Sequence, residues 1–278
     1  MDIFFLEKVK VLRKMTGVGV KICSDVLLKS DCSLDVAVGE LRKIGLLKAE
    51  SISTRISTEG QICVCLSNDK KRAVLIELNT ETDYVSRKEE FKSFLLKISN
   101  IVIDNFIEEK DNLMSFYISK GISVSDSILD LVSLYGENIF ISKYKYIKIE
   151  EGFLSSYIHG NNVGKIGAVV HYLGENHDLA YDIAIHVAAM NPLYLDYNSV
   201  PLSVVKNEKD IFFSEVKKLY PEKNNLVLNK IVDGKLDKYL SGIVLLEQIF
   251  VKSGELKIKD VLNNQIRLLT YFRFEVGK

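Results

Sequence analysis

What this 278-residue sequence has little of already excludes several classes of protein. Its four cysteines, Cys23, Cys32, Cys63 and Cys65, are too sparse for a disulfide framework and are typical of reduced cytosolic thiols. The formal net charge is +0 and no long block of one sign occurs, whereas a dedicated nucleic-acid binder has a basic face. No apolar stretch approaches the ~18 residues that a membrane span needs. A protein partner or a small ligand therefore stays open as the target.

The start of the chain does not have the pattern of a secretory signal. Residues Met1 to Leu6 include no basic residue, and the charges of Glu7, Lys8 and Lys10 interrupt the apolar run. We therefore expect a cytoplasmic protein.

Motifs for phosphate binding, metal binding and catalysis are also missing. There is no Gly-x-x-x-x-Gly-Lys-Ser/Thr and no Gly-x-Gly-x-x-Gly after a strand. Asp182 and His186 stand four apart on an expected helix, but no third ligand has metal spacing, so a surface pair or a packed histidine is favoured. Cys63-x-Cys65 is better explained by two buried small side chains than by a metal or redox pair. We expect no enzyme active site, no metal and no cofactor.

Residues 1–50 predict a module of three short helices. Its apolar stripes are, in order, Phe5, Val9 and Leu12; Ile22, Val26 and Leu27; and Leu34, Ala37, Val38 and Leu41. The segment from Thr16 to Gly19 separates the first two helices, Ser33 can cap the third, and Gly45 is expected to end it. A unit of this size buries little core alone, so we expect it to pack against something else. A polar linker at 51–58 follows.

The remaining chain predicts an α+β fold with two related lobes, residues 59–150 and residues 151–201 with 241–278. In each lobe an apolar strand precedes an amphipathic helix, and we expect antiparallel sheets. The expected strands are 61–66, 73–78, 139–149, 165–172 and 272–276, and helices are expected after 86, at 124–135 and around 183–190. The helix around 183–190 has Ile183, Val187 and Met190 on one side.

Residues 202–240 predict a helical hairpin inserted into the second lobe. The two helices have narrow apolar stripes and Pro221 lies between them. The stripes are Leu202, Val205, Phe212, Val216 and Leu219, then Leu228, Ile231, Val232 and Tyr239. A narrow stripe on two helices joined by a short turn is typical of a coiled-coil hairpin.

The candidate functional site is the segment from Asn79 to Val85. It follows an apolar strand and precedes Ser86-x-x-Glu89, a capping-box pattern that predicts a helix. The apolar face of this helix consists of Phe91, Phe94, Leu95, Ile98, Ile101, Val102 and Phe106. A rigid strand and helix would present Asp83-Tyr84 to solvent, and loops held in this way tend to carry function. Taken by chemistry alone, an ordinary turn that contains an aspartate is the favoured interpretation.

The tip also carries a family resemblance. Leu78-Asn79-x-x-Thr82-Asp83-Tyr84-Val85, with Phe91 further on, resembles the signature of the elongation factor Ts family. Other segments resemble that family in the same order: Leu12-Arg13, Thr16-Gly17-x-Gly19, Cys23, Leu41-Arg42-x-x-Gly45, Tyr135-Gly136-Glu137-Asn138-Ile139, Ser156-Tyr157-x-His159-Gly160, Lys165-Ile166-Gly167, residues 186–192, residues 245–250 and residues 272–277. Tyr84 departs from the phenylalanine usual there, and the sequence stops at Lys278, before the C-terminal helix of longer relatives.

The resemblance implies a guanine-nucleotide exchange factor that binds elongation factor Tu, both GDP-bound and nucleotide-free. It implies that Thr82, Asp83, Tyr84 and Val85 bind this partner and dislocate its Mg²⁺, and that residues 1–50 form a UBA-like module. The secondary partner contacts that it implies are Arg13, Val18, Gly19 and His159. No direct contact with nucleic acid or membrane is expected, and a homodimer is left open. The alternative is an interaction scaffold without exchange activity.

Overall fold

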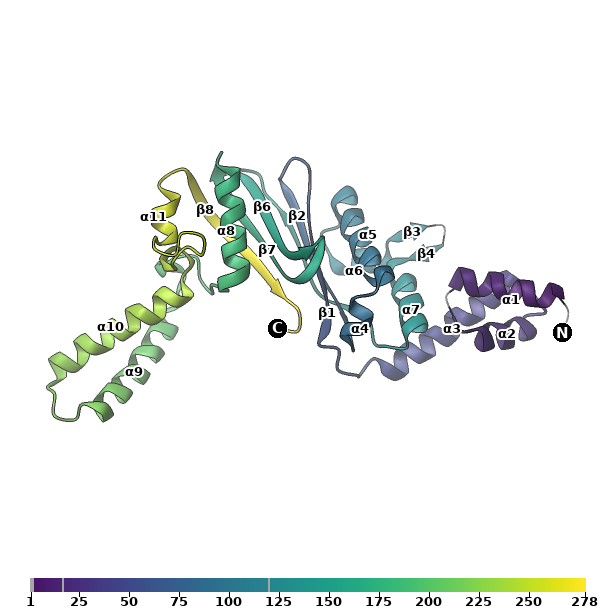
Figure 1. The fold of residues 1–278 in the computed structure, drawn as a ribbon, viewed down its shortest axis with the longest axis horizontal. Coiled ribbons are helices and arrows are strands. Elements are labelled where there is room, and N and C mark those ends of the chain that lie inside the picture. The colour runs from purple at the N-terminus through teal and green to yellow at the C-terminus, as the bar shows by residue number, and fades with distance from the viewer. Residues whose placement is uncertain (1–2, 17, 120) are drawn as a thin grey trace. The chain divides into compact units, whose positions relative to one another are not determined.

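The computed structural model describes residues 3–16, 18–119 and 121–278 and confirms the α+β class (Figure 1). The chain divides into two compact units. The first unit comprises residues 1–148, 158–167 and 274–278, and the second comprises residues 149–157 and 168–273. Among the described residues, no helix combines the length and apolar character needed to cross a membrane.

The N-terminal helices of the first unit are α1 (Ile3–Thr16), α2 (Val20–Lys29) and α3 (Leu34–Ile52). Their common core confirms most of the predicted stripes, and it consists of Phe5, Val9, Leu12, Val18, Cys23, Val26, Leu27, Ala37 and Leu41. The prediction for Ile22 is wrong: its side chain is 44% exposed, and the neighbouring Cys23 is buried in its place. Gly17, part of the predicted break between α1 and α2, lies outside the described residues.

The prediction that Gly45 ends the third helix is also wrong. Helix α3 continues past Gly45 to Ile52, and it packs on α7 (Val124–Tyr135). A Cβ at Gly45 would lie 2.4 Å from the Ser133 hydroxyl oxygen of α7, so glycine here permits two helices to approach closely. Ile52 is buried in the core beneath the sheet of this unit. One helix therefore joins the three-helix module to the rest of the first unit.

The sheet of the first unit is built on the predicted hairpin. Strand β1 (Glu59–Leu66) pairs antiparallel with β2 (Arg72–Thr80), in a register from Glu59–Thr80 to Leu66–Ala73. Strand β5 (Phe140–Lys148) pairs with the other edge of β2, with a bulge between Glu77 and Leu78. Strand β7 (Val163–Gly174) begins beside β1, opposite Ile62 and Cys63. The hydrogen-bonded order is thus β5-β2-β1-β7.

Helix α5 (Glu89–Asn105) covers the hairpin with the predicted apolar face. Its buried side chains on that face are Phe91, Leu95, Ile98 and Val102, and Phe94 and Ile101 are partly buried. Phe106 does not belong to the face: it ends the helix in the left-handed conformation and is 59% exposed, with the Arg72 guanidinium 4.3 Å from its ring centroid. The shorter elements of this unit are α4 (Asp83–Ser86), α6 (Lys110–Ser115), β3 (Tyr117–Ser119) and β4 (Ile122–Ser123).

The second unit contains β6 (Phe153–Asn161) as far as Tyr157, most of β7, and β8 (Ile266–Glu275) as far as Arg273. Helix α8 (His177–Met190) is joined to β8 by a hydrogen bond from the Arg273 Nε to the Ala188 carbonyl at 3.1 Å. Met190, predicted to share the buried side of α8, is 46% exposed at its end. The short helices are η1 (Tyr197–Ser199), η2 (Leu245–Glu247) and α11 (Ile258–Leu262).

His186 of α8 is a fully buried structural residue. Its Nε2 lies 2.9 Å from the Gln248 side-chain oxygen, and its Nδ1 accepts from the Val251 backbone N–H at 3.2 Å. Asp182 forms an ion pair with Lys252 instead of facing a metal with His186. In the described part of the chain, no three His, Cys, Asp or Glu residues are grouped to hold a metal.

Stability should fall when His186 becomes protonated. Burial lowers the pKa of His186 below its ordinary value, so the unfolded chain binds the proton more readily than the folded chain. The stabilisation that comes from this shift is then complete above about pH 7.5, and it is lost as the pH falls below about 6.5 towards the lowered pKa of the folded state. We expect His186→Gln to be less stable at pH 7.5 but to lose less of its free energy of unfolding than the wild type between about pH 7.5 and 5.5. Urea unfolding at the two pH values measures this, and equal losses would contradict it.

The second unit also carries the predicted helical hairpin, formed by α9 (Leu202–Leu219) and α10 (Asn225–Ile243), which are drawn in green in Figure 1. Two apolar clusters hold it together. The distal cluster contains Val216, Leu228 and Val232 with Phe212, Phe213 and Ile231, and the basal cluster contains Val200, Leu236, Leu240 and Val244 with Tyr194. Leu202 and Leu219 were predicted on the stripe but are 86% and 59% exposed.

The distal half of this hairpin should be dispensable for the fold. We expect replacement of residues 213–235 by a short Gly/Ser link to remove helical signal only, because Val216, Leu228 and Val232 pack within the hairpin and Phe212 stays with the basal cluster. Replacing all of residues 202–240 should also lower the melting temperature, because it removes Leu236 and leaves Val200 and Val244 without their buried contact. Circular dichroism during thermal unfolding compares the two variants, and equal melting temperatures would contradict the role of the basal cluster.

Candidate partner-binding site

The predicted tip is a single helical turn, α4, capped by Thr82. The Thr82 backbone is extended, with φ −122° and ψ 154°, and its hydroxyl oxygen accepts from the Val85 backbone N–H at 3.4 Å. This is the ordinary geometry of a helix N-cap. The tip is therefore an ordered turn of helix at the end of β2.

The predicted capping box at Ser86 is wrong. Ser86 ends α4, and its buried hydroxyl donates to the Asp83 carbonyl at 3.0 Å. Helix α5 begins at Glu89, after Lys88, and the Lys88 side chain makes no capping hydrogen bond. The capping residue of this region is Thr82, ahead of α4, and a one-turn helix has too few residues to show an apolar period in the sequence.

The four predicted tip residues separate into two that project and two that hold the turn. Tyr84 is 65% exposed and the Asp83 side chain is 56% exposed. Val85 is 2% exposed and belongs to the core beneath the sheet, whereas Thr82 is occupied as the cap. Asp83 and Tyr84 are therefore the projecting side chains, whereas Thr82 is exposed but has its hydroxyl engaged in hydrogen bonds.

Each projecting side chain has a cation of the same segment beside it. The Arg87 guanidinium lies 2.8 Å from the Asp83 carboxylate, and the Lys88 ammonium lies 3.9 Å from the Tyr84 ring centroid. Exposed pairs of this kind contribute only about 0–1 kcal/mol, so a partner can replace them at little cost. The i,i+4 spacing of Asp83 and Arg87 could have predicted the first pair from the sequence.

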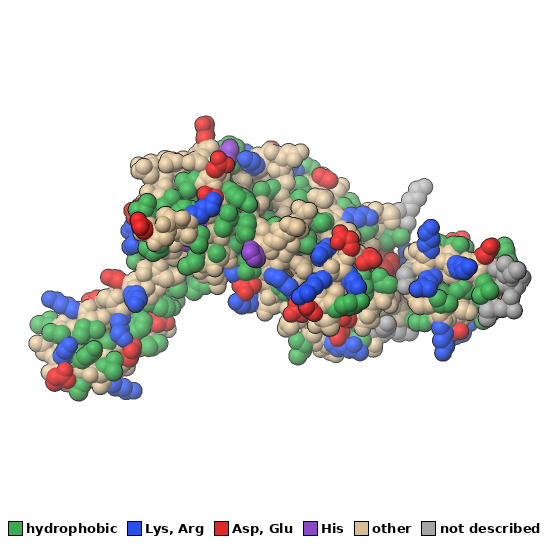
Figure 2. All heavy atoms as spheres, viewed as in Figure 1, with side chains coloured by type: hydrophobic (Ala, Val, Ile, Leu, Met, Phe, Trp, Pro, Cys, Tyr) green, Lys and Arg blue, Asp and Glu red, His purple; other side chains and the backbone are tan. Residues whose placement is uncertain are grey.

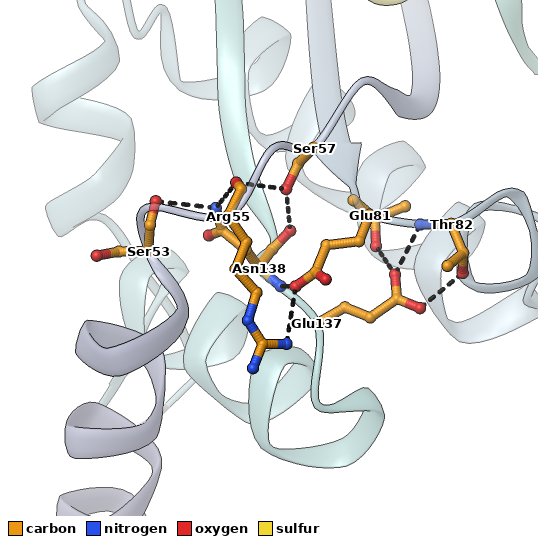
Figure 3. Close-up of polar contacts among 8 residues, drawn as sticks. Ser53, Arg55, Ser57, Glu81, Thr82, Glu137 and Asn138 are labelled. Atoms are coloured by element: carbon orange, nitrogen blue, oxygen red, sulfur yellow. Dashed lines mark hydrogen bonds and ion pairs between the residues drawn. The ribbon is translucent and has the colours of Figure 1, made fainter.

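The carboxylate of Glu137 holds the tip through hydrogen bonds to Thr80 and Thr82, as Figure 3 shows for Thr82. It accepts from the Thr80 hydroxyl at 2.6 Å, from the Thr82 backbone N–H at 3.0 Å and from the Thr82 hydroxyl at 2.6 Å. Hydrogen bonds to an ionised acceptor are about twice as strong as neutral ones. Glu137 thus fixes both the end of β2 and the cap of α4.

A second set of bonds joins the residue after Glu137 to the chain that leaves α3 (Figure 3). The Asn138 backbone N–H donates to the Glu81 carboxylate at 2.8 Å, and Arg55 forms a 3.5 Å ion pair with the same carboxylate. The Asn138 side-chain amide donates to the carbonyls of Ser53 and Arg55, each at 3.1 Å. The Ser57 hydroxyl donates to the Asn138 carbonyl at 3.1 Å.

Glu137 and Asn138 stand out in the sequence as part of a motif, but their role at the tip could not be predicted from it. They lie 55 residues or more from the groups that they bind, so no local spacing points to the contact. Next to them, the Tyr135 hydroxyl donates to the Glu90 carboxylate at 3.0 Å, which ties the end of α7 to the start of α5. Burial, with this bond, raises the pKa of Tyr135 to about 12.

The predicted secondary contacts lie on other elements than the tip. Arg13 is exposed on α1, Gly19 is exposed at the start of α2, and His159 is exposed on β6. Val18 is 8% exposed and belongs to the three-helix core. Arg13, Gly19 and His159 are thus accessible to a partner, whereas the side chain of Val18 is not. Figure 2 shows one face of the molecule, on which charged side chains of both signs are interspersed.

Comparison with known proteins shows which family the chain resembles over most of its length. A family model described as Elongation factor TS matches residues 81–278. A curated protein named Elongation factor Ts from Phytoplasma australiense is 36% identical over 277 residues, which cover 98% of each chain. Proteins of the same name from Halothermothrix orenii and Legionella pneumophila (strain Lens) are 33% and 31% identical, over 98% and 96% of this chain and 92% and 90% of their own. The chain therefore belongs to the elongation factor Ts family.

Proposed function

We propose that this chain is a guanine-nucleotide exchange factor, which binds elongation factor Tu and promotes the release of GDP during translation elongation. The observation that carries the proposal is the tip: in a member of this family, an exposed carboxylate and an exposed aromatic ring project from a capped turn. Aromatic side chains that fill a pocket contribute strongly at protein interfaces. The chain makes and breaks no covalent bond in this role.

In this proposal Asp83 and Tyr84 enter the GTP-binding domain of the partner and disturb its Mg²⁺ and phosphate site. Mg²⁺ neutralises phosphate charge, so its displacement removes a large attraction for GDP. Linkage requires reciprocity: a factor that weakens GDP binding is itself bound more weakly when GDP is present. The factor therefore binds the nucleotide-free partner more tightly than the GDP-bound partner.

The remaining surface holds the partner while the tip acts. The three-helix module supplies Arg13 and Gly19, and strand β6 supplies His159, all exposed. Val18 contributes through the core of the module or through its backbone, because its side chain is buried. The factor needs no cofactor and no metal of its own in this mechanism.

Release of fluorescent GDP from elongation factor Tu tests the proposal. GDP release should accelerate when this chain is added, and excess Mg²⁺ should oppose the effect. The alternative, an interaction scaffold, would bind elongation factor Tu and leave the release rate unchanged. Binding without acceleration would therefore overturn the proposed function in favour of the scaffold.

A further inference from the structure

We propose that Glu137 is the positioning residue of the tip, an inference that rests on the proposed exchange function. It lies far from the tip in the sequence, yet its carboxylate fixes the conformation in which Asp83 and Tyr84 project. Glu137 acts through Thr82 and makes no contact with nucleotide or Mg²⁺ in this role.

The bonding at Thr82 explains why this carboxylate matters. Thr82 must stay extended to cap α4, and a threonine can cap a helix only while its hydroxyl oxygen points at the following turn. Glu137 accepts both the backbone N–H and the hydroxyl hydrogen of Thr82, so the oxygen lone pair is left for the Val85 N–H. Loss of the carboxylate frees both the backbone and the hydroxyl rotor.

Glu137 can act as an anchor because its own backbone is fixed on both sides. Gly136 ends α7 in the left-handed conformation, with φ 73°, and its N–H bonds to the Val132 carbonyl at 2.8 Å. Asn138 is 8% exposed and donates through its side chain to the carbonyls of Ser53 and Arg55. Glu137, and the tip that it binds, is thereby fixed relative to both α7 and the residues that follow α3.

The hydrogen bonds of Glu137 also predict how its loss should affect the release of GDP from the partner. Its two oxygens already accept three hydrogen bonds within the chain, and Asp83 and Tyr84 remain present in any Glu137 variant. Partner contacts elsewhere on the surface remain too. Loss of Glu137 should therefore lower the maximal rate of GDP release much more than it raises the half-saturating concentration of the factor.

Stopped-flow release of fluorescent GDP, measured against increasing factor concentration, tests this with Glu137→Ala. We expect the maximal rate to fall at least about tenfold, because a misplacement of about 1 Å at an acting group can cost a hundredfold. The half-saturating concentration should change by less than about threefold. The matched control is Glu108→Ala, which removes an exposed glutamate of the same unit outside this network and should leave both values unchanged. A wild-type maximal rate, or a change confined to the half-saturating concentration, would overturn the inference.

Glu137→Gln covers the case in which the alanine variant does not fold. Its side-chain oxygen can keep the bonds from the Thr80 hydroxyl and the Thr82 backbone N–H, while its amide nitrogen must donate to the Thr82 hydroxyl oxygen. The maximal rate of GDP release should therefore lie between those of the wild type and Glu137→Ala. Native-state hydrogen exchange separates this inference from the proposed function. The amides of Thr82 and Val85 should exchange hydrogen at least about tenfold faster in Glu137→Ala, whereas Glu137→Gln, which can keep the bond to the Thr82 N–H, should mainly speed exchange of the Val85 amide; amides of α5 should be unchanged in both. If the wild type does not accelerate GDP release, the proposed function fails. Unchanged hydrogen exchange at both Thr82 and Val85 would overturn the positioning role of Glu137, whether or not GDP release is accelerated.

Discussion

Asp83→Ala combined with Tyr84→Ala should lower the stimulated rate of GDP release from elongation factor Tu by about a hundredfold. Two projecting groups that each contribute about 1.4 kcal/mol give that factor, and anchoring side chains at interfaces commonly exceed this contribution. Folding stability should change by only about 0.5 kcal/mol, because both side chains are exposed and their partners, Arg87 and Lys88, remain solvated. The release assay and urea unfolding, performed on the same preparation, measure the two effects.

Tyr84→Phe is the matched control for this result. It restores the residue that the family usually has and keeps the ring, and no hydroxyl bond is lost inside a core because Tyr84 is 65% exposed. We expect activity equal to or above that of the wild type. Normal GDP release by the double alanine variant would contradict the proposed mechanism, whatever the family of the chain.

Lys143→Met should destabilise the fold far more than the loss of a lysine from an ordinary surface ion pair. The Lys143 ammonium forms an ion pair with the Glu77 carboxylate at 2.8 Å, and Glu77 is 1% exposed on β2. The other Glu77 oxygen accepts from the Gly277 backbone N–H at 3.0 Å, so the pair also fastens residues 274–278 to the sheet of the first unit. Removing the lysine leaves a buried carboxylate without its counter-ion.

The expected loss is about 2 kcal/mol in the free energy of unfolding. Breaking a fully buried pair costs about 3–5 kcal/mol, and the one-third exposure of the lysine side chain reduces this value. Lys209→Met is the matched control, because it removes the same side chain from an exposed pair with Asp233 and should cost at most about 0.5 kcal/mol. Glu77→Gln should cost less than Lys143→Met, because it removes the buried charge and can keep the bond from Gly277. Urea unfolding of the three variants measures these losses, and equal losses for the two lysine variants would contradict the argument.

The sequence by itself determined the elements that have a clear local period. The helix at 124–135, the hairpin of β1 and β2 and the pair α9 and α10 all appear where apolar spacing predicts them. Such patterns are readable because an amphipathic element repeats its buried face every two or every 3.6 residues. The projection of Asp83-Tyr84 was predictable for a related reason, since a polar tip stood between an apolar strand and an apolar helix.

Only the tertiary structure decided where elements end and how the tip is held. Gly45 carries the local signal of a helix end, yet α3 continues past it and packs closely on α7, with Gly45 facing Ser133. Glu77 looks like a solvated strand residue, yet it is buried against Lys143. Glu137 reaches Thr82 across 55 residues of sequence. Each of these outcomes depends on a contact between distant segments, and such a contact has no period in the sequence, because chain folding alone brings its two partners together.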